Sequence, residues 1–193
     1  HVLAGHVAAR ALRIRAAAGA GDGEAVIDPH ALGTFAGYGA DIRVALSPGS
    51  REPVAELPLA ALITGWVRAQ VSPDAAAEVH IVGPDTADAA RLRAAIDGAP
   101  DPVGLLVVAD GAHTLTAAAP GGFDPDSVPA QAVLDDALAA GDTAGLARAA
   151  AGAVGRDAYR VLADLIGSAP VSATELYRGA PYGVGYFAGT WRV

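Results

Sequence analysis

The chain of 193 residues contains no cysteine, lysine, methionine or asparagine. Because there is no cysteine, disulfide bonds and thiolate chemistry are excluded. Because there is no lysine, the chain cannot form a lysine Schiff base or supply the lysine of a phosphate-binding loop. The absence of methionine indicates that the sequence does not begin at a translation start, so we expect that N-terminal residues are missing or that His1 is not native.

Charged residues are scarce as well, at 18% against 52% hydrophobic residues, a balance that argues against disorder. No apolar run approaches the roughly 20 residues of a membrane span, and no signal peptide is visible, so we expect a cytoplasmic protein. The net charge of −8 would repel nucleic acid and anionic membranes, so neither is an expected partner. The length predicts a single domain over residues 1–193.

Periodic segments predict alternating strands and helices along most of the chain. Strands are expected at 24–28, 41–46, 78–82, 103–109 and 183–193, and helices at 1–18, 86–96, 127–140, 142–151 and 157–166. A further helix begins near Pro58, where Leu59, Leu62, Ile63, Trp66 and Val67 form one apolar stripe that we expect to face the core. The alternation predicts an α/β fold, a three-layer sandwich with a mostly parallel central sheet.

One loop has the right position for chemistry. In open α/β sheets ligands bind beyond the carboxyl ends of the strands, and the apolar segment 103–109 runs directly into a glycine-containing loop with His113. An imidazole titrates near neutral pH, so His113 could act as an acid or a base. The alternative is a histidine that only caps or hydrogen-bonds the loop.

Several segments occur together in an order that is typical of one family. The strand-to-histidine segment 109–115 (ADGAHTL) is followed by a Pro-Gly-Gly-Phe-Asp turn at 120–124 and by a helix that closes on Gly141-Asp142. The segments 33–39 (GTFAGYG) and 180–187 (APYGVGYF) complete the set. Together they resemble the subunit-B-like branch of the class III extradiol ring-cleavage dioxygenases, in particular its small actinobacterial members. The resemblance spans roughly residues 24–193.

By this resemblance, His113 takes the place of the catalytic acid/base histidine, although Ala112 stands where a serine is usual. The family reaction uses Fe(II) held by two histidines and one carboxylate, with open positions for a catechol and dioxygen. The resemblance implies His30 and Glu175 as metal ligands, with His1 and His6 as candidates only by default. The alternatives are a loop histidine at 30 and a solvated carboxylate at 175.

Two functions follow from this incomplete ligand set. The first is a homologue that has lost the full metal site and serves as a binding or assembly protein, which we expect to be a homo-oligomer. The second is an Fe(II)-dependent dioxygenase that cleaves a small catechol-type aromatic, with His113 as acid/base. The ligand set favours the first. His80, within a predicted strand, is interpreted as packed or edge-exposed, and Trp191 and Tyr186 as parts of a packed terminal strand.

Overall fold

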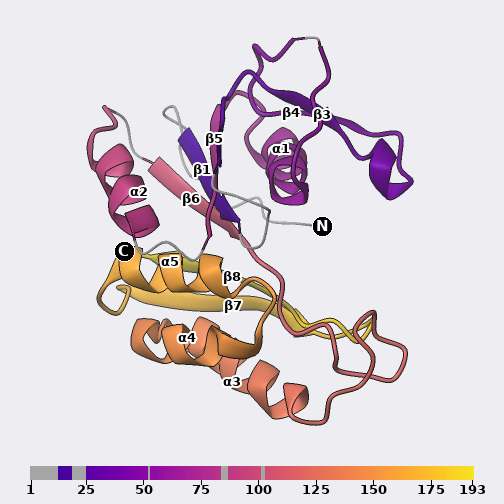
Figure 1. Cartoon of the computed structure of the whole chain (residues 1–193). Helices are drawn as coiled ribbons and strands as arrows, with labels where there is room; N and C mark the ends of the chain where they lie inside the picture. The colour runs from indigo at the N-terminus through magenta and orange to yellow at the C-terminus, as the bar shows by residue number, and fades with distance from the viewer. Residues whose placement is uncertain (1–12, 19–24, 52, 84–86, 101–102) are drawn as a thin grey trace. The chain divides into compact units, whose positions relative to one another are not determined.

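The structure is a computed structural model that describes residues 13–18, 25–51, 53–83, 87–100 and 103–193 (Figure 1). The chain divides into two compact units. The N-terminal unit comprises residues up to 82 together with 91–108, and the C-terminal unit comprises 83–90 and 109–193. The assignment of residues 1–193 to a single dioxygenase-like domain stays a prediction.

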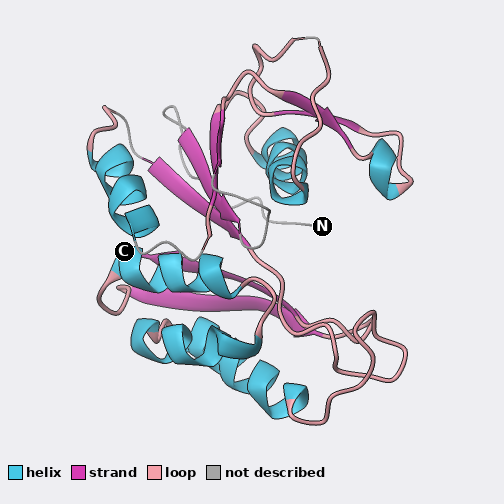
Figure 2. Ribbon diagram, in the orientation of Figure 1, coloured by secondary structure: helices cyan, strands magenta, loops and turns pink. Residues whose placement is uncertain are grey.

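The N-terminal unit contains a four-stranded sheet (Figure 2). Its strands are β1 (Arg13–Ala18), β2 (Ala25–Ile27), β5 (Ala77–Ile81) and β6 (Val103–Val108), in the order β2-β5-β1-β6. β1 pairs in parallel with β5 and β6, whereas β2 runs antiparallel to β5. β5 alternates between buried and half-buried positions, so one face of the sheet packs on the core of this unit. Residues 13–18 thus form a strand where a helix over 1–18 was expected.

Helix α1 (Leu59–Val71) packs on this sheet and on the hairpin of β3 (Leu32–Thr34) and β4 (Arg43–Ala45), whose loop contains the short helix η1 (Ala36–Tyr38). The buried side of the helix consists mainly of small residues, together with Leu62 and Arg68. A Cβ at Gly65 would lie 3.2 Å from the Ala45 carbonyl oxygen, so the helix approaches β4 through this glycine. The bulky stripe therefore turns partly outward, and the prediction that Trp66 is a core residue is wrong, since 48% of it is exposed.

Helix α2 (Ala87–Asp97) has residues in both units, since its residues up to 90 belong to the C-terminal unit and those from 91 on belong to the N-terminal unit. The C-terminal unit continues with α3 (Ser127–Ala140), α4 (Thr143–Ala149), η2 (Ala150–Gly152), α5 (Arg156–Ile166), β7 (Ser172–Gly179) and β8 (Tyr186–Arg192). α4 contacts both α3 and α5, and the β7–β8 hairpin lies along α3 (Figure 1). The core of this unit is built from Leu134, Leu138, Leu146 and Tyr159, with Phe187 and Trp191 of β8 packed against it.

The predicted three-layer sandwich with a mostly parallel central sheet is wrong. Parallel pairing among the described residues is confined to β5-β1-β6, and the other strand pairs, β2-β5, β3-β4 and β7-β8, are antiparallel. The reason lies in the connections. Only residues 180–185 separate β7 from β8, whereas a parallel crossover needs about a dozen residues or more. The described part of the chain is mixed α and β without a large parallel central sheet. No helix among the described residues is both long and apolar enough to cross a bilayer.

Candidate ligand pocket

A pocket with a volume of about 190 Å³ lies in the C-terminal unit. Its apolar walls come from Ala130 and Leu134 of α3, from Ala149 at the end of α4, and from Ala153 just after η2. The small side chains of Ala130, Ala149 and Ala153 leave room between α3 and the α4–η2 segment. Ala112, in the loop after β6, joins the lining.

The Gln131 side chain fixes the inner part of this pocket. Its Oε1 accepts a hydrogen bond from the Ala112 N–H at 2.7 Å, and its Nε2 donates to Asp135 Oδ1 at 2.7 Å. Two glycines leave the space that the amide occupies. A Cβ at Gly111 would lie 2.6 Å from Gln131 Oε1, and one at Gly185 would lie 2.3 Å from Gln131 Cδ. The loops before His113 and before β8 therefore close on a single buried amide, which holds them in register with α3.

The outer rim of the pocket is polar. Ser127 Oγ donates to Asp124 Oδ2 at 3.2 Å and lies 2.5 Å from Thr114 Oγ1. Because the single hydroxyl proton of Ser127 goes to Asp124, Thr114 is the donor in the second contact. Asp124 Oδ1 also accepts the Asp126 N–H at 3.0 Å, so this carboxylate organises the turn that leads into α3. The Asp126 side chain, by contrast, makes no hydrogen bond to the N-terminus of the helix.

His113, the predicted acid/base residue, directly follows the lining residue Ala112 in the sequence but is not itself part of the pocket lining. The residue is exposed, and its ring lies along Gly121, where a Cβ would be 2.6 Å from His113 Cδ2. The Gly121 N–H donates to the His113 carbonyl oxygen at 3.0 Å, which closes the turn beneath the ring. The loop thus presents the imidazole at its surface.

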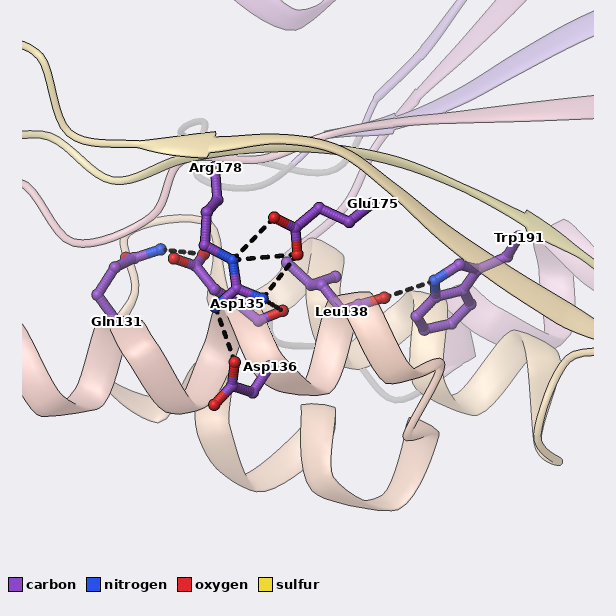
Figure 3. A network of polar contacts seen from close by, with 7 residues as sticks. All are labelled: Gln131, Asp135, Asp136, Leu138, Glu175, Arg178 and Trp191. Atoms are coloured by element: carbon purple, nitrogen blue, oxygen red, sulfur yellow. Dashed lines mark hydrogen bonds and ion pairs between the residues drawn. The ribbon is translucent and has the colours of Figure 1, made fainter.

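Glu175, the predicted carboxylate ligand, belongs to an ion-pair network between β7 and α3 (Figure 3). Its two oxygens accept from Arg178, at 3.1 Å each from Nε and at 2.7 Å from Nη2 to Oε2. Arg178 Nη1 also donates to Asp136 at 2.7 Å. The hydrogen bonds that Arg178 donates to Glu175 and Asp136 raise the pKa of its guanidinium, so the arginine carries its charge within this network. Both oxygens of Glu175 are occupied by this arginine.

Asp135 lies behind the same network but is itself buried, with 7% of the residue exposed. Burial raises the pKa of its carboxyl, while the hydrogen bond from Gln131 and the nearby Arg178 charge act in the opposite direction. Asp135 therefore links the pocket amide to the charged surface of α3 and β7.

His30, the predicted metal histidine, belongs to the N-terminal unit, whereas His113 and Glu175 belong to the C-terminal unit. Its backbone N–H donates to Asp28 Oδ1 at 2.7 Å, and its ring lies next to Gly49. Among the described residues no three His, Asp or Glu side chains gather into a group that could hold a metal ion. His1 and His6 lie outside the described residues. The metal and acid/base assignments stay predictions.

Sequence reasoning missed the residues that shape the pocket. A single glutamine within a helix has no motif around it. The role of Gln131 could not be predicted from the sequence, because it depends on contacts with two loops that are distant along the chain. Asp124-Pro125-Asp126 resembles half a calcium loop without its glycine and late glutamate, and in the structure Asp124 caps a turn instead. No family model and no curated protein matches the sequence. The resemblance to the dioxygenases thus depends on the sequence segments alone.

Proposed function

We propose that this chain is a binding protein that holds a small molecule in the pocket of its C-terminal unit, without metal-dependent ring cleavage. The observation that carries the proposal is the pocket beside a preorganised amide, in which Gln131 is locked by Ala112 and Asp135. Its volume of about 190 Å³ is below the roughly 300–1,000 Å³ of pockets for drug-sized ligands, so the ligand has few non-hydrogen atoms.

The contacts of the expected catalytic residues support binding rather than ring cleavage. Glu175 is held through both oxygens by Arg178, so metal binding would require it to leave a charged, bidentate partner. The exposed ring of His113 lies on Gly121 outside the pocket lining, so a ligand in the pocket would not face it. A binding role requires only the pocket and the fixed Gln131 amide, which the loops and α3 form.

A nuclear magnetic resonance screen tests the proposal. Small compounds of positive, neutral and negative charge are added to the full chain, and amide shifts of Ala112, Ser127 and Gln131 are followed. We expect at least one compound to move these amides in a saturable way. The Ala130→Leu variant, which fills the pocket from α3, should abolish the response while its circular dichroism spectrum and melting temperature confirm that it folds. Ala149→Leu fills the same space from α4 and serves if the first variant does not fold.

Two results would contradict the proposal. One is a complete screen in which no compound shifts the pocket amides, or in which the shifts persist in both filled variants. The other is turnover of a catechol by the purified chain with Fe(II) and dioxygen, since that would restore the dioxygenase interpretation with His113 as acid/base. The expectations of a cytoplasmic, homo-oligomeric protein without nucleic acid or membrane partners remain part of the proposal.

A further inference from the structure

We infer that the ligand of this pocket is a small organic cation, an ammonium group on a short apolar body; this inference rests on the proposed function. The cavity defines the position of the site, and the lining residues indicate the charge of the ligand. Asp124 and Asp126 stand at its rim, and no Arg or His occurs among the lining residues. The remaining walls are mainly alanines and Leu134, which suit a short hydrocarbon.

The first turn of α3 decides between a cation and an anion. A helix N-terminus attracts anions through its unpaired N–H groups. Here the Ser127 N–H donates to the Asp124 carbonyl oxygen, and the Ala130 N–H donates to the Asp126 carbonyl oxygen. Pro129 has no N–H to offer. The donors that would hold an anion are therefore largely used or missing, and two carboxylates already stand at this helix end.

The two carboxylates have different parts in the site. Asp124 accepts from Ser127 and from the Asp126 N–H, so its oxygens already organise the turn. The Asp126 carboxylate is exposed and makes no capping contact, so it can meet an ammonium group without breaking an existing hydrogen bond. Asp126 thus determines the charge preference of the site, and Asp124 maintains its shape.

Three probes of similar size and different charge test the inference: n-butylammonium, n-butanol and butyrate. Titrations follow the same pocket amides in the full chain. We expect butylammonium to bind about tenfold more tightly than n-butanol, a factor that corresponds to about 1.4 kcal/mol. Butyrate should bind most weakly. The Asp126→Asn variant should bring the butylammonium affinity down to that of n-butanol and leave n-butanol unchanged.

The matched control is Asp164→Asn, which removes the same charge from an exposed position on α5 that is not part of the pocket lining. It should leave the butylammonium affinity within about twofold, because an exposed charge outside the lining is screened by salt. Equal losses in both variants would overturn the inference, since attraction to the overall charge of −8 would then suffice. Pocket-dependent binding of n-butanol or butyrate at least as tight as that of butylammonium would also overturn it, while leaving the proposed binding function intact. If no compound of any charge moves the pocket amides, the proposed function fails together with the inference.

Discussion

Arg68 makes the most specific prediction about stability, because it is a buried arginine whose partners are all backbone carbonyls. Only 6% of the residue is exposed. Its Nε donates to the Ala45 carbonyl oxygen at 3.0 Å, and its Nη1 donates to those of Ala75, at 3.0 Å, and Pro73. The arginine thereby joins α1 to the end of β4 and to the turn that leads into β5. Burial lowers the pKa of the guanidinium, and the charge of Asp74 partly offsets this effect.

Replacing Arg68 by Met keeps much of the side-chain volume and removes every donor. The Pro73 carbonyl belongs to an exposed residue and can be hydrated, but Ala75 is buried and Ala45 is half-buried. A buried group left without its partner costs about 1–3 kcal/mol, and two such groups are affected. Relief of the guanidinium from its desolvated site offsets part of this cost. We therefore expect Arg68→Met to lower the free energy of unfolding by about 2–4 kcal/mol.

Urea unfolding in a Trp191→Phe background measures this change, because Trp66, on α1 itself, is then the only tryptophan. Arg51→Met is the matched control in the same unit. Arg51 is exposed, and substitutions of that kind usually change stability by less than about 0.5 kcal/mol. If Arg68→Met differs from Arg51→Met by less than about 1 kcal/mol, the three carbonyl contacts do not stabilise the unit, and the reasoning is refuted.

Three further predictions concern the C-terminal unit. Gly185→Ala places a Cβ 2.3 Å from Gln131 Cδ and should lower the melting temperature markedly, whereas Gly152→Ala meets nothing within 4 Å and should not. Trp191→Phe loses the hydrogen bond from Nε1 to the Leu138 carbonyl oxygen and should cost about 0.5–1.5 kcal/mol in urea unfolding. The folded-state pKa of Asp135 is raised above 3.8, so its ionisation destabilises the fold as pH rises through that pKa. Asp135→Asn should therefore melt higher than wild type at pH 7, and thermal melts should show the gap closing below pH 3.8; a gap that widens in acid would contradict the sign.

Helices with clear stop signals were predictable from the sequence. The expected helix over 127–140 coincides with α3, because Gly141 ends it in a left-handed conformation at φ 67°. The helix expected over 157–166 begins one residue later than α5, whose apolar side is buried among α4 and its neighbours. In these cases local pattern and tertiary packing agree, so the sequence alone carries the information.

The strand that decides the fold of the C-terminal unit was not predictable in the same way. The register of β7 against β8 shifts between Glu175 and Tyr177, which interrupts the two-residue alternation that marks a strand. Without β7, the tail strand expected at 183–193 could join a parallel sheet, whereas in the structure β8 closes a hairpin with β7. Likewise the apolar stripe through Trp66 was assigned to the core because a helical pattern does not reveal that Gly65 lets the opposite face pack more closely.

The same distinction separates the predicted site from the observed pocket. The family resemblance implied His30 and Glu175, and the position after a strand indicated His113. The structure engages each of them locally: His30 beside Gly49, His113 on Gly121, and Glu175 with Arg178. The pocket depends instead on contacts between residues far apart in sequence, such as Gln131 with the loops at 111–112 and 185. Such contacts cost chain entropy to form and are specified by shape rather than by residue type. Since function resides in the site and not in the fold, the proposed ligand rests on the charge of the pocket rim and not on the resemblance of any single segment.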